Sequence, residues 1–380
     1  MGKTIKITIA VALMVLSIPF CKRWFSTVEY YFSDEGEKAT SSLKYRLTGT
    51  KTVEVAGLER FWSGEVIIPE KTIYCGYLCT VTSIGKDAFY GCSRITSVKI
   101  PTSVTEIGDY AFKGCSSLRD VEIPMSVTEI GKYAFLGCSG LTSVEIPTSV
   151  IEIGWGAFEE CSGLTSVEIP LSVTKIDYYT FSGCSGLTSV KIPSSVTEIG
   201  SEAFKGCSSL RDVEIPMSVT EIGKYAFLGC SGLTSVEIPT SVIEIGWGAF
   251  EECSRLTSVN IPSSVTKIGG EAFKECSIFT VEIPTSVTEI GWGAFEGCSW
   301  MTSVEIPSSV TEIGGEAFSR CSGLTYVEIP SSVTEIGERA FKNCYSLINL
   351  NIVIDNTKNN VKVGKDAFEG CESVTWKKDM

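Results

Sequence analysis

The segment LTSVEIPTSVIEIGWGAFEECSG, residues 141–163, is one copy of a unit that fills most of this 380-residue chain. Close variants of it precede and follow without a linker, and self-similarity at a fixed period of this size is the signature of a solenoid. Each unit of such an array buries its apolar side against its neighbours. We therefore expect one continuous core along the array rather than several separate domains.

Thirteen cysteines occupy the same position in successive units. Most steps between them equal one full unit, such as the step from Cys115 to Cys138. The step before Cys298 is one position shorter, because SIFTVEIP lacks a residue, and the step before Cys371 is four positions longer, because IDNTKNNVKVG carries an insertion. The series is Cys92, Cys115, Cys138, Cys161, Cys184, Cys207, Cys230, Cys253, Cys276, Cys298, Cys321, Cys344 and Cys371.

Apolar and polar residues alternate in the first part of the unit. Val144 and Ile146 alternate with Ser143 and Glu145, a period of two that predicts a short strand with one buried face. Pro147 ends that strand because proline has no amide hydrogen for a ladder. The same alternation within SVIEI predicts a second, shorter extended segment on another wall.

The last part of the unit has helical spacing. A glycine such as Gly131 supplies a turn, and Ala134, Phe135 and Cys138 then take positions i, i+1 and i+4 of one helical or 3₁₀ turn with an apolar inner face. The sequence thus predicts a repeat solenoid of about thirteen 23-residue coils. Its main face carries parallel strands, and its other walls carry short extended segments and helical or 3₁₀ turns.

The two ends of the chain depart from the unit. Residues 1–23 combine Lys3 and Lys6 with the apolar run 7–16, which predicts an export signal or an N-terminal anchor. Residues 24–80 contain alternating stretches such as KYRLTGTKTVEVAG and predict a β-rich N-terminal cap. Residues 81–371 form the solenoid, and residues 372–380 form a charged C-terminal tail.

The composition argues against two classes of function. The chain has 45 acidic and 32 basic residues, a formal charge of −13, which is the wrong sign for a surface that neutralises phosphates, so nucleic acid is not an expected partner. Histidine is absent, which removes the commonest general base and metal ligand. With no phosphate loop, nucleophile elbow or paired acid/base motif outside the repeat, we expect no enzyme activity, no cofactor and no metal site.

Residues 111–162 recur without change at 203–254, an offset of four whole units. A linear solenoid tolerates such a change in unit number, whereas a closed active site would not.

The combination of a strand, proline, VTxIG and AFxxC at fixed spacing resembles the BspA-like leucine-rich repeat, over about residues 66–371. The resemblance implies a right-handed solenoid that is secreted or lies at the cell surface and serves adhesion or protein binding. It carries no catalytic residues to transfer. The expected partner is an extracellular or host protein, with a glycan as an alternative. We expect no multi-span membrane protein, and the oligomeric state is left open.

The thirteen spaced cysteines are expected to be buried and to act as small hydrophobic side chains, since single thiols one unit apart do not converge on a metal. Cys75 and Cys79 differ because Gly76, Tyr77 and Leu78 separate them in an expected hairpin loop. In an exported protein this pair could form a disulfide, and the sequence leaves that question open.

The solvent face of the main strand carries acidic side chains in most units. This column, which we call the acidic ladder, fits a binding face for a basic partner, and it also fits a charged surface that keeps the sheet soluble. A parallel run on the second segment, from Glu106 to Glu335, favours the solubility interpretation, because one partner cannot cover both walls. The ladder comprises Glu122, Glu145, Glu168, Glu214, Glu237, Glu282, Glu305 and Glu328, with Lys99, Lys191, Asn260 and Asn351 in the remaining units.

Trp155, Trp247 and Trp292 each lie between two glycines, which cannot shield an indole, so partial exposure is expected. Trp247 and Trp292 are two coils apart, about 10 Å by the strand spacing, and could both stack on one glycan chain. The alternative is that each indole packs over the neighbouring turn. Two further hypotheses therefore stand beside protein binding, namely a passive spacer or stalk and a glycan-binding module.

Overall fold

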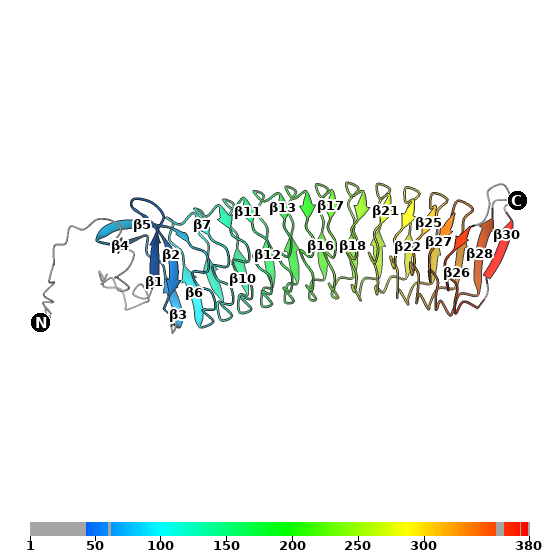
Figure 1. Cartoon of the computed structure of the whole chain (residues 1–380), viewed down its shortest axis with the longest axis horizontal. Coiled ribbons are helices and arrows are strands. Elements are labelled where there is room, and N and C mark those ends of the chain that lie inside the picture. Colours follow the sequence, from blue (N-terminus) through cyan, green and yellow to red (C-terminus); the bar gives the residue numbers. More distant parts are fainter. Residues whose placement is uncertain (1–42, 60–61, 355–360, 373, 379–380) are drawn as a thin grey trace, which may run out of the picture.

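The computed structural model describes residues 43–59, 62–354, 361–372 and 374–378. The export signal or anchor predicted for residues 1–23 lies outside these residues, as does the part of the predicted cap before residue 43. Figure 1 shows the coils stacked side by side along one long axis, with the N-terminal hairpins at one end and the last strands at the other. Nearly every strand pairing between coils is parallel and in register, so the predicted solenoid is confirmed.

The predicted main strand forms the first wall of the solenoid, wall 1. Its inward residue is buried and its two outward residues are exposed in coil after coil, as in Ser143–Glu145, because the pleat sends alternate side chains to opposite faces. The strands of wall 1 are β3 (Gly64–Ile67), β6 (Ile95–Lys99), β8 (Asp120–Glu122), β10 (Ser143–Glu145), β12 (Ser166–Glu168), β14 (Ser189–Lys191), β16 (Asp212–Glu214), β18 (Ser235–Glu237), β20 (Ser258–Asn260), β22 (Thr280–Glu282), β24 (Ser303–Glu305), β26 (Tyr326–Ile329), β28 (Asn349–Ile354) and β30 (Val374–Lys378).

The second extended segment forms wall 2. Thirteen of its strands follow one another among the described residues, four from β5 to β11 and nine from β13 to β29, in agreement with about thirteen coils. They are β5 (Tyr77–Ile84), β7 (Glu106–Ile107), β9 (Glu129–Ile130), β11 (Glu152–Ile153), β13 (Lys175–Ile176), β15 (Glu198–Ile199), β17 (Glu221–Ile222), β19 (Glu244–Ile245), β21 (Lys267–Ile268), β23 (Glu289–Ile290), β25 (Glu312–Ile313), β27 (Glu335–Ile336) and β29 (Lys362–Val363).

The corner between the two walls is a turn that begins at the proline. The amide of Val150 donates to the carbonyl oxygen of Pro147 at 3.0 Å, which closes the turn. Ser149 in that turn donates its hydroxyl to the carbonyl oxygen of Val127 in the preceding coil at 2.7 Å. The Pro-x-Ser-Val pattern therefore both turns the chain and ties each coil to the one before it.

The expected helical segment is instead a series of turns, and no helix or 3₁₀ segment occurs among the described residues. Ala111 and Lys113 donate to the carbonyl oxygens three residues earlier, but Tyr110 has φ +56° and Gly114 φ +74°, and these left-handed residues prevent a continuous helix. The amides between the turns point along the stack: Phe112 donates to the carbonyl oxygen of Ala134 in the next coil at 2.6 Å. This segment is thus a third wall, wall 3, which is joined by its own ladder of hydrogen bonds.

The core consists of columns of identical side chains. Twelve phenylalanines from Phe89 to Phe341 are fully buried, and successive rings stack with centroids 5.0–5.7 Å apart. Burying one phenylalanine stabilises the fold by about 1.5–3 kcal/mol, so this column is a large part of the stabilising free energy. The cysteines from Cys115 to Cys344 are buried as free thiols beside it, as predicted.

Antiparallel hairpins add to the N-terminal end of the stack. Strand β1 (Leu43–Leu47) pairs with β2 (Thr52–Leu58), and β2 continues wall 2 by parallel pairing with β5. Strand β4 (Lys71–Tyr74) pairs with β5 in a second hairpin. At the other end, the segment expected to be a tail contains β30, which pairs with β28 and extends wall 1.

Candidate functional site

The acidic ladder lies on the outer face of wall 1. All eight of its glutamates are exposed. Register places Glu145 beside Glu168, and Glu305 between Glu282 and Glu328, so the carboxylates form in-register columns. The structure therefore brings together side chains that are far apart in the sequence, over a surface many coils long.

Basic residues interrupt the ladder at two places. The Nζ of Lys191 lies 2.5 Å from a carboxylate oxygen of Glu168, and both side chains are more than two-thirds exposed, so the pair contributes about 0–1 kcal/mol. Lys99 lies 3.5 Å from Glu65 on the neighbouring strand β3, where register pairs Lys99 with Ile67. The remaining carboxylates, such as Glu237 and Glu305, make no ion pair with a described residue and are available to a partner.

Wall 2 carries the second column of charges that the sequence predicted. Glu129 lies between Glu106 and Glu152, and burial, followed by repulsion from these two carboxylates, raises the pKa of Glu129. Lysines relieve this repulsion in other coils, where Lys175 lies 2.9 Å from Glu198 and Lys362 lies 2.6 Å from Glu335.

The three Gly-Trp-Gly indoles are partly exposed, at 42% for Trp155, 38% for Trp247 and 41% for Trp292. Trp247 and Trp292 stack on each other with centroids 6.2 Å apart, closer than two coil spacings. Gly270 lies in the coil between them, where a Cβ would overlap the indole of Trp247, and this leaves room for the two rings to approach.

Trp155 has different neighbours. Its ring meets Tyr178 edge-on at 5.4 Å, and the Nζ of Lys132 lies 4.9 Å above it. The tryptophans are thus engaged with nearby side chains of the chain itself, which favours the packing interpretation over a row of free glycan platforms.

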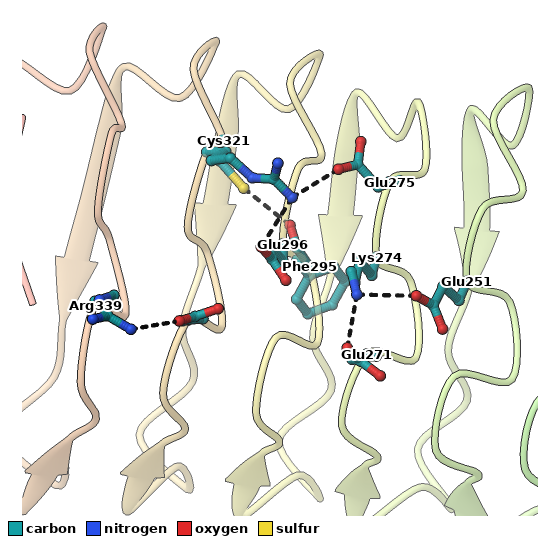
Figure 2. A network of polar contacts seen from close by, with 10 residues as sticks. Glu251, Glu271, Lys274, Glu275, Phe295, Glu296, Cys321 and Arg339 are labelled. Atoms are coloured by element: carbon teal, nitrogen blue, oxygen red, sulfur yellow. Dashed lines mark hydrogen bonds and ion pairs between the residues drawn. The ribbon is translucent and has the colours of Figure 1, made fainter.

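Wall 3 carries an ion-pair network that the sequence analysis missed, shown in Figure 2. Lys274 binds Glu251 at 3.0 Å and Glu271 at 2.7 Å, and Arg320 binds Glu275 at 2.8 Å and Glu296 at 2.9 Å. Glu251 and Glu296 are only 8% exposed. The sequence feature that could have predicted this network is the occurrence of both acidic and basic residues at the two positions between phenylalanine and cysteine in successive units.

Burial dominates the electrostatics of these two glutamates. It raises the pKa of Glu251 and of Glu296, although Lys274 and Arg320 favour their charged forms. The network joins several coils along wall 3 and contains no nucleophile, so its chemistry is that of structural ion pairs. No group of three or more potential metal ligands occurs among the described residues.

The open question on Cys75 and Cys79 is answered against a bond between them. Cys79 is a buried free thiol, and Cys75 is in a disulfide that does not involve Cys79. Register explains this, because Tyr74 pairs with Tyr77 and Thr72 with Cys79, so Cys75 and Gly76 alone form the hairpin turn. Both turn residues have positive φ, 51° and 84°, as a type I′ turn requires, and Cys79 lies further along the strand.

A shallow notch interrupts the surface at the coil that lacks one residue, 277–298, which we call the short coil, and this notch too was missed. Arg255, Phe279 and Trp300 line it, and Trp300 is 59% exposed. The signal was the missing residue in SIFTVEIP, which the sequence analysis noted as an irregularity of spacing only.

Comparisons with known proteins agree with this architecture. The model of the BspA type leucine rich repeat region matches residues 77–188, 175–301 and 288–376. No match was found in a search of curated proteins. Among the described residues there is no apolar helix of the length that a membrane span requires.

Solved structures of bacterial proteins are similar over most of the chain. A leucine-rich repeat protein from Bacteroides ovatus is 31% identical, covering 91% of this chain and 100% of that one, with a TM-score of 0.74. A leucine rich cell surface protein from Faecalibacterium prausnitzii is 33% identical, covering 86% and 96%, with a TM-score of 0.61. The pneumococcal vaccine antigen PcpA, at 19% identity, 84% and 93% coverage and a TM-score of 0.58, shares the fold. From its repeat, its stacked parallel walls and these matches, the chain belongs to the BspA-type leucine-rich-repeat family.

Proposed function

We propose that this chain is a non-catalytic, exported protein, secreted or held at a cell surface, that binds another protein along wall 1. The observation that carries the proposal is the acidic ladder, whose carboxylates are exposed and in register over many coils. The solved relative from Faecalibacterium prausnitzii is described as a cell surface protein, which supports the location. The predicted export signal at residues 1–23 supports it as well.

Electrostatics indicate the kind of partner. Two like charges about 5 Å apart repel by about 0.8 kcal/mol in water, so the free ladder carries a small unfavourable energy in every coil. A cationic segment of a partner lying along the ladder would replace that repulsion with attraction and would associate faster at low salt. We therefore propose a basic, extended region of an extracellular or host protein as the bound element, and adhesion as the outcome.

Wall 1 is also suited to binding because it is rigid. Each coil that carries a strand of wall 1 is also hydrogen-bonded to its neighbours along walls 2 and 3, so little conformational entropy would be lost when a partner binds. The exposed serine and threonine side chains between the carboxylates add hydrogen-bonding groups.

The test is a binding screen of purified extracellular-matrix and host-surface proteins by biolayer interferometry, at about 50 and 300 mM salt. We expect at least one ligand whose affinity falls at high salt. A variant with Glu282→Gln, Glu305→Gln and Glu328→Gln on wall 1 should bind it more weakly. The matched control, Glu289→Gln, Glu312→Gln and Glu335→Gln, removes the same charge from wall 2 of the same coils and should bind like the wild type. Absence of any ligand, or equal loss in both variants, would overturn the proposal.

A second candidate function is a passive spacer, and the identical segments 111–162 and 203–254 favour it, because length alone can then vary by whole coils. Glycan binding through the Gly-Trp-Gly indoles has less support, since Trp247 and Trp292 already stack on each other.

A further inference from the structure

Ile278 takes the place of the buried leucine of other coils, and the residue that precedes this leucine in other coils is missing from the short coil. Ser277 is followed directly by Ile278, so this coil has no counterpart of Arg255 in the coil before it or of Trp300 in the coil after it. Wall 1 differs locally at strand β20, which precedes the short coil. Val259 on β20 is half-buried, whereas Val236 and Val281 in the neighbouring coils are 5% and 6% exposed.

The missing residue leaves a notch of about 350 Å³ between its two neighbours. This volume is at the lower end of the range of small-molecule sites, about 300–1,000 Å³, so the notch fits one or two rings rather than a folded partner. It is open and shallow, as expected for a site that takes one unit of a longer chain.

One side of the notch is aromatic. Phe279 and Trp300 are 48% and 59% exposed and meet edge-to-face, with centroids 6.1 Å apart and an angle of 70° between the rings. Two exposed rings at nearly a right angle offer an apolar face and an apolar edge to a ligand. At these two positions most other coils carry small or polar residues, such as Thr257 and Gly323.

The charged side of the notch is basic, in a chain of net charge −13. Arg255 is exposed and makes no ion pair with any described residue. The acidic ladder is interrupted in the same coil, where Asn260 takes the place of glutamate. A free guanidinium favours a carboxylate, which it can bind through two parallel hydrogen bonds.

The hydroxyls that line the notch are oriented as acceptors. Ser277 donates to the carbonyl oxygen of Ser254 at 2.7 Å, and Thr257 donates to that of Thr234 at 3.2 Å. Each hydroxyl oxygen keeps lone pairs that can accept a hydrogen bond from a ligand. The notch therefore combines a carboxylate-binding donor, hydroxyl acceptors and an aromatic corner.

From this combination we infer that the notch binds a carboxylate-bearing sugar, a uronic acid or sialic acid unit of a larger glycan. The apolar C–H face of the pyranose would lie on Trp300, its carboxylate would bind Arg255, and its hydroxyls would donate to Thr257 and Ser277. A cationic or neutral peptide would leave the guanidinium without a partner, and an acidic peptide lacks the ring hydroxyls that match the acceptors. This site is independent of the protein-binding role proposed for the acidic ladder.

Isothermal titration calorimetry of the full chain tests the inference. The probes are tetragalacturonate and 3′-sialyllactose, with methyl-esterified tetragalacturonate and lactose as neutral counterparts and a glutamate-rich peptide as the protein-derived anion. We expect saturable binding of at least one acidic saccharide, and which one binds identifies the source of the carboxylate. Arg255→Ser and Trp300→Ser introduce serine, the residue found at the equivalent position of two other coils, Ser117 and Ser209. Each substitution should weaken binding at least tenfold.

Two further variants separate the site from general damage. Insertion of one glycine between Ser277 and Ile278 restores a coil of full length and should abolish binding while the fold is kept. Tyr345→Ser removes an aromatic residue that is 61% exposed two coils away, and it should bind like the wild type. The inference is overturned if neither acidic saccharide binds, if the neutral probes bind equally well, if the notch variants retain full affinity, or if only the acidic peptide binds.

Discussion

The Sγ of Cys230 donates a hydrogen bond to the carbonyl oxygen of Phe204, 3.1 Å away in the preceding coil. The same contact recurs from Cys115 to Cys371 with distances of 3.1–3.3 Å, so each thiol ties its coil to the one before. The carbonyl oxygen of Phe204 also accepts the amide of Cys207 within its own turn, so the thiol adds a second hydrogen bond that a purely apolar side chain of the same size could not provide.

This arrangement predicts unreactive thiols in the native protein. Burial, followed by the neighbouring thiols Cys207 and Cys253, raises the pKa of Cys230 well above its ordinary value of 9.0, and only a thiolate reacts readily. At pH 8, iodoacetamide should leave the buried column unlabelled. Half-buried Cys92, whose pKa burial raises to about 11, should react slowly, and half-buried Cys371, whose pKa is lowered by its hydrogen bond with Cys344, should react faster. In guanidinium the whole column should become labelled. Peptide mass spectrometry measures each site, and fast native labelling of Cys230 would contradict the burial.

The phenylalanine column predicts a position-dependent cost of truncation. Phe227 is fully buried and stacks on Phe204 and Phe250 at 5.3 Å on both sides, so Phe227→Ala should cost about 3–5 kcal/mol of the free energy of unfolding. Phe368 stacks on Phe341 on one side only and is half-buried, so Phe368→Ala should cost clearly less. Urea unfolding followed by circular dichroism compares the two, and equal costs would argue against stabilisation by stacking on both neighbours.

A comparison of alanine substitutions at two glycines separates the energetic cost of backbone strain from that of steric overlap. Gly248 and Gly293 both have left-handed φ, +59° and +60°, but a Cβ on Gly248 would overlap the ring of Tyr225, whereas on Gly293 the nearest atom, Cγ of Glu271, is 3.4 Å away. Gly293→Ala should cost about 1–2 kcal/mol, the penalty of a left-handed conformation for an L-residue. Gly248→Ala should cost more. Thermal unfolding measures both, and equal losses would show that Tyr225 moves aside freely.

Local periodicity was enough to predict the two walls. Val144 and Ile153 are buried because alternation fixes which side chains face inward once the coils stack, and every coil repeats the same pattern. The expected helical or 3₁₀ turn was not confirmed, because the spacing of Ala134, Phe135 and Cys138 shows only that their side chains share a face. That spacing does not reveal a left-handed residue such as Tyr133, with φ +54°.

The candidate site was harder to predict because it depends on contacts between coils. Cys75 and Cys79 flank a short loop in the sequence, but the register of their hairpin depends on turn conformation. The stacking of Trp247 on Trp292 depends on the missing side chain at Gly270, one coil away. The notch arises from a residue that is absent, which residue-type patterns do not report.

Mild acidification is predicted to stabilise the fold. Burial is the largest cause that raises the pKa of Glu129, Glu159, Glu251 and Glu296 above the ordinary value of 4.5. Between 4.5 and those raised values the native state binds more protons than the unfolded state, so the free energy of unfolding increases as pH falls through that window. The gain is complete below the ordinary pKa of 4.5 and is lost as pH rises through the raised pKa values. Urea midpoints at pH 7 and pH 5 test this, and a lower midpoint at pH 5 would contradict it.

Because segments 111–162 and 203–254 are identical, four coils can be deleted without creating a new kind of contact between neighbouring coils. Removing residues 163–254 joins Ser162 to Arg255, which recreates the Ser254–Arg255 junction of the native chain, because the segment before the cut, 111–162, is identical to the deleted 203–254. We expect a folded solenoid shorter by four coils, or about 19 Å at about 4.8 Å per coil, measurable by small-angle scattering. Thr142 and Ser162 then take the places of Thr234 and Ser254 beside the notch, so acidic-saccharide binding should persist.

The same deletion variant distinguishes the two proposed functions. A protein that binds along the acidic ladder should bind more weakly, in proportion to the number of its contacted coils that are deleted, whereas a passive spacer would lose length alone. Failure of this deletion variant to fold would show that neighbouring coils are not interchangeable, against the nearest-neighbour stacking on which the whole architecture rests.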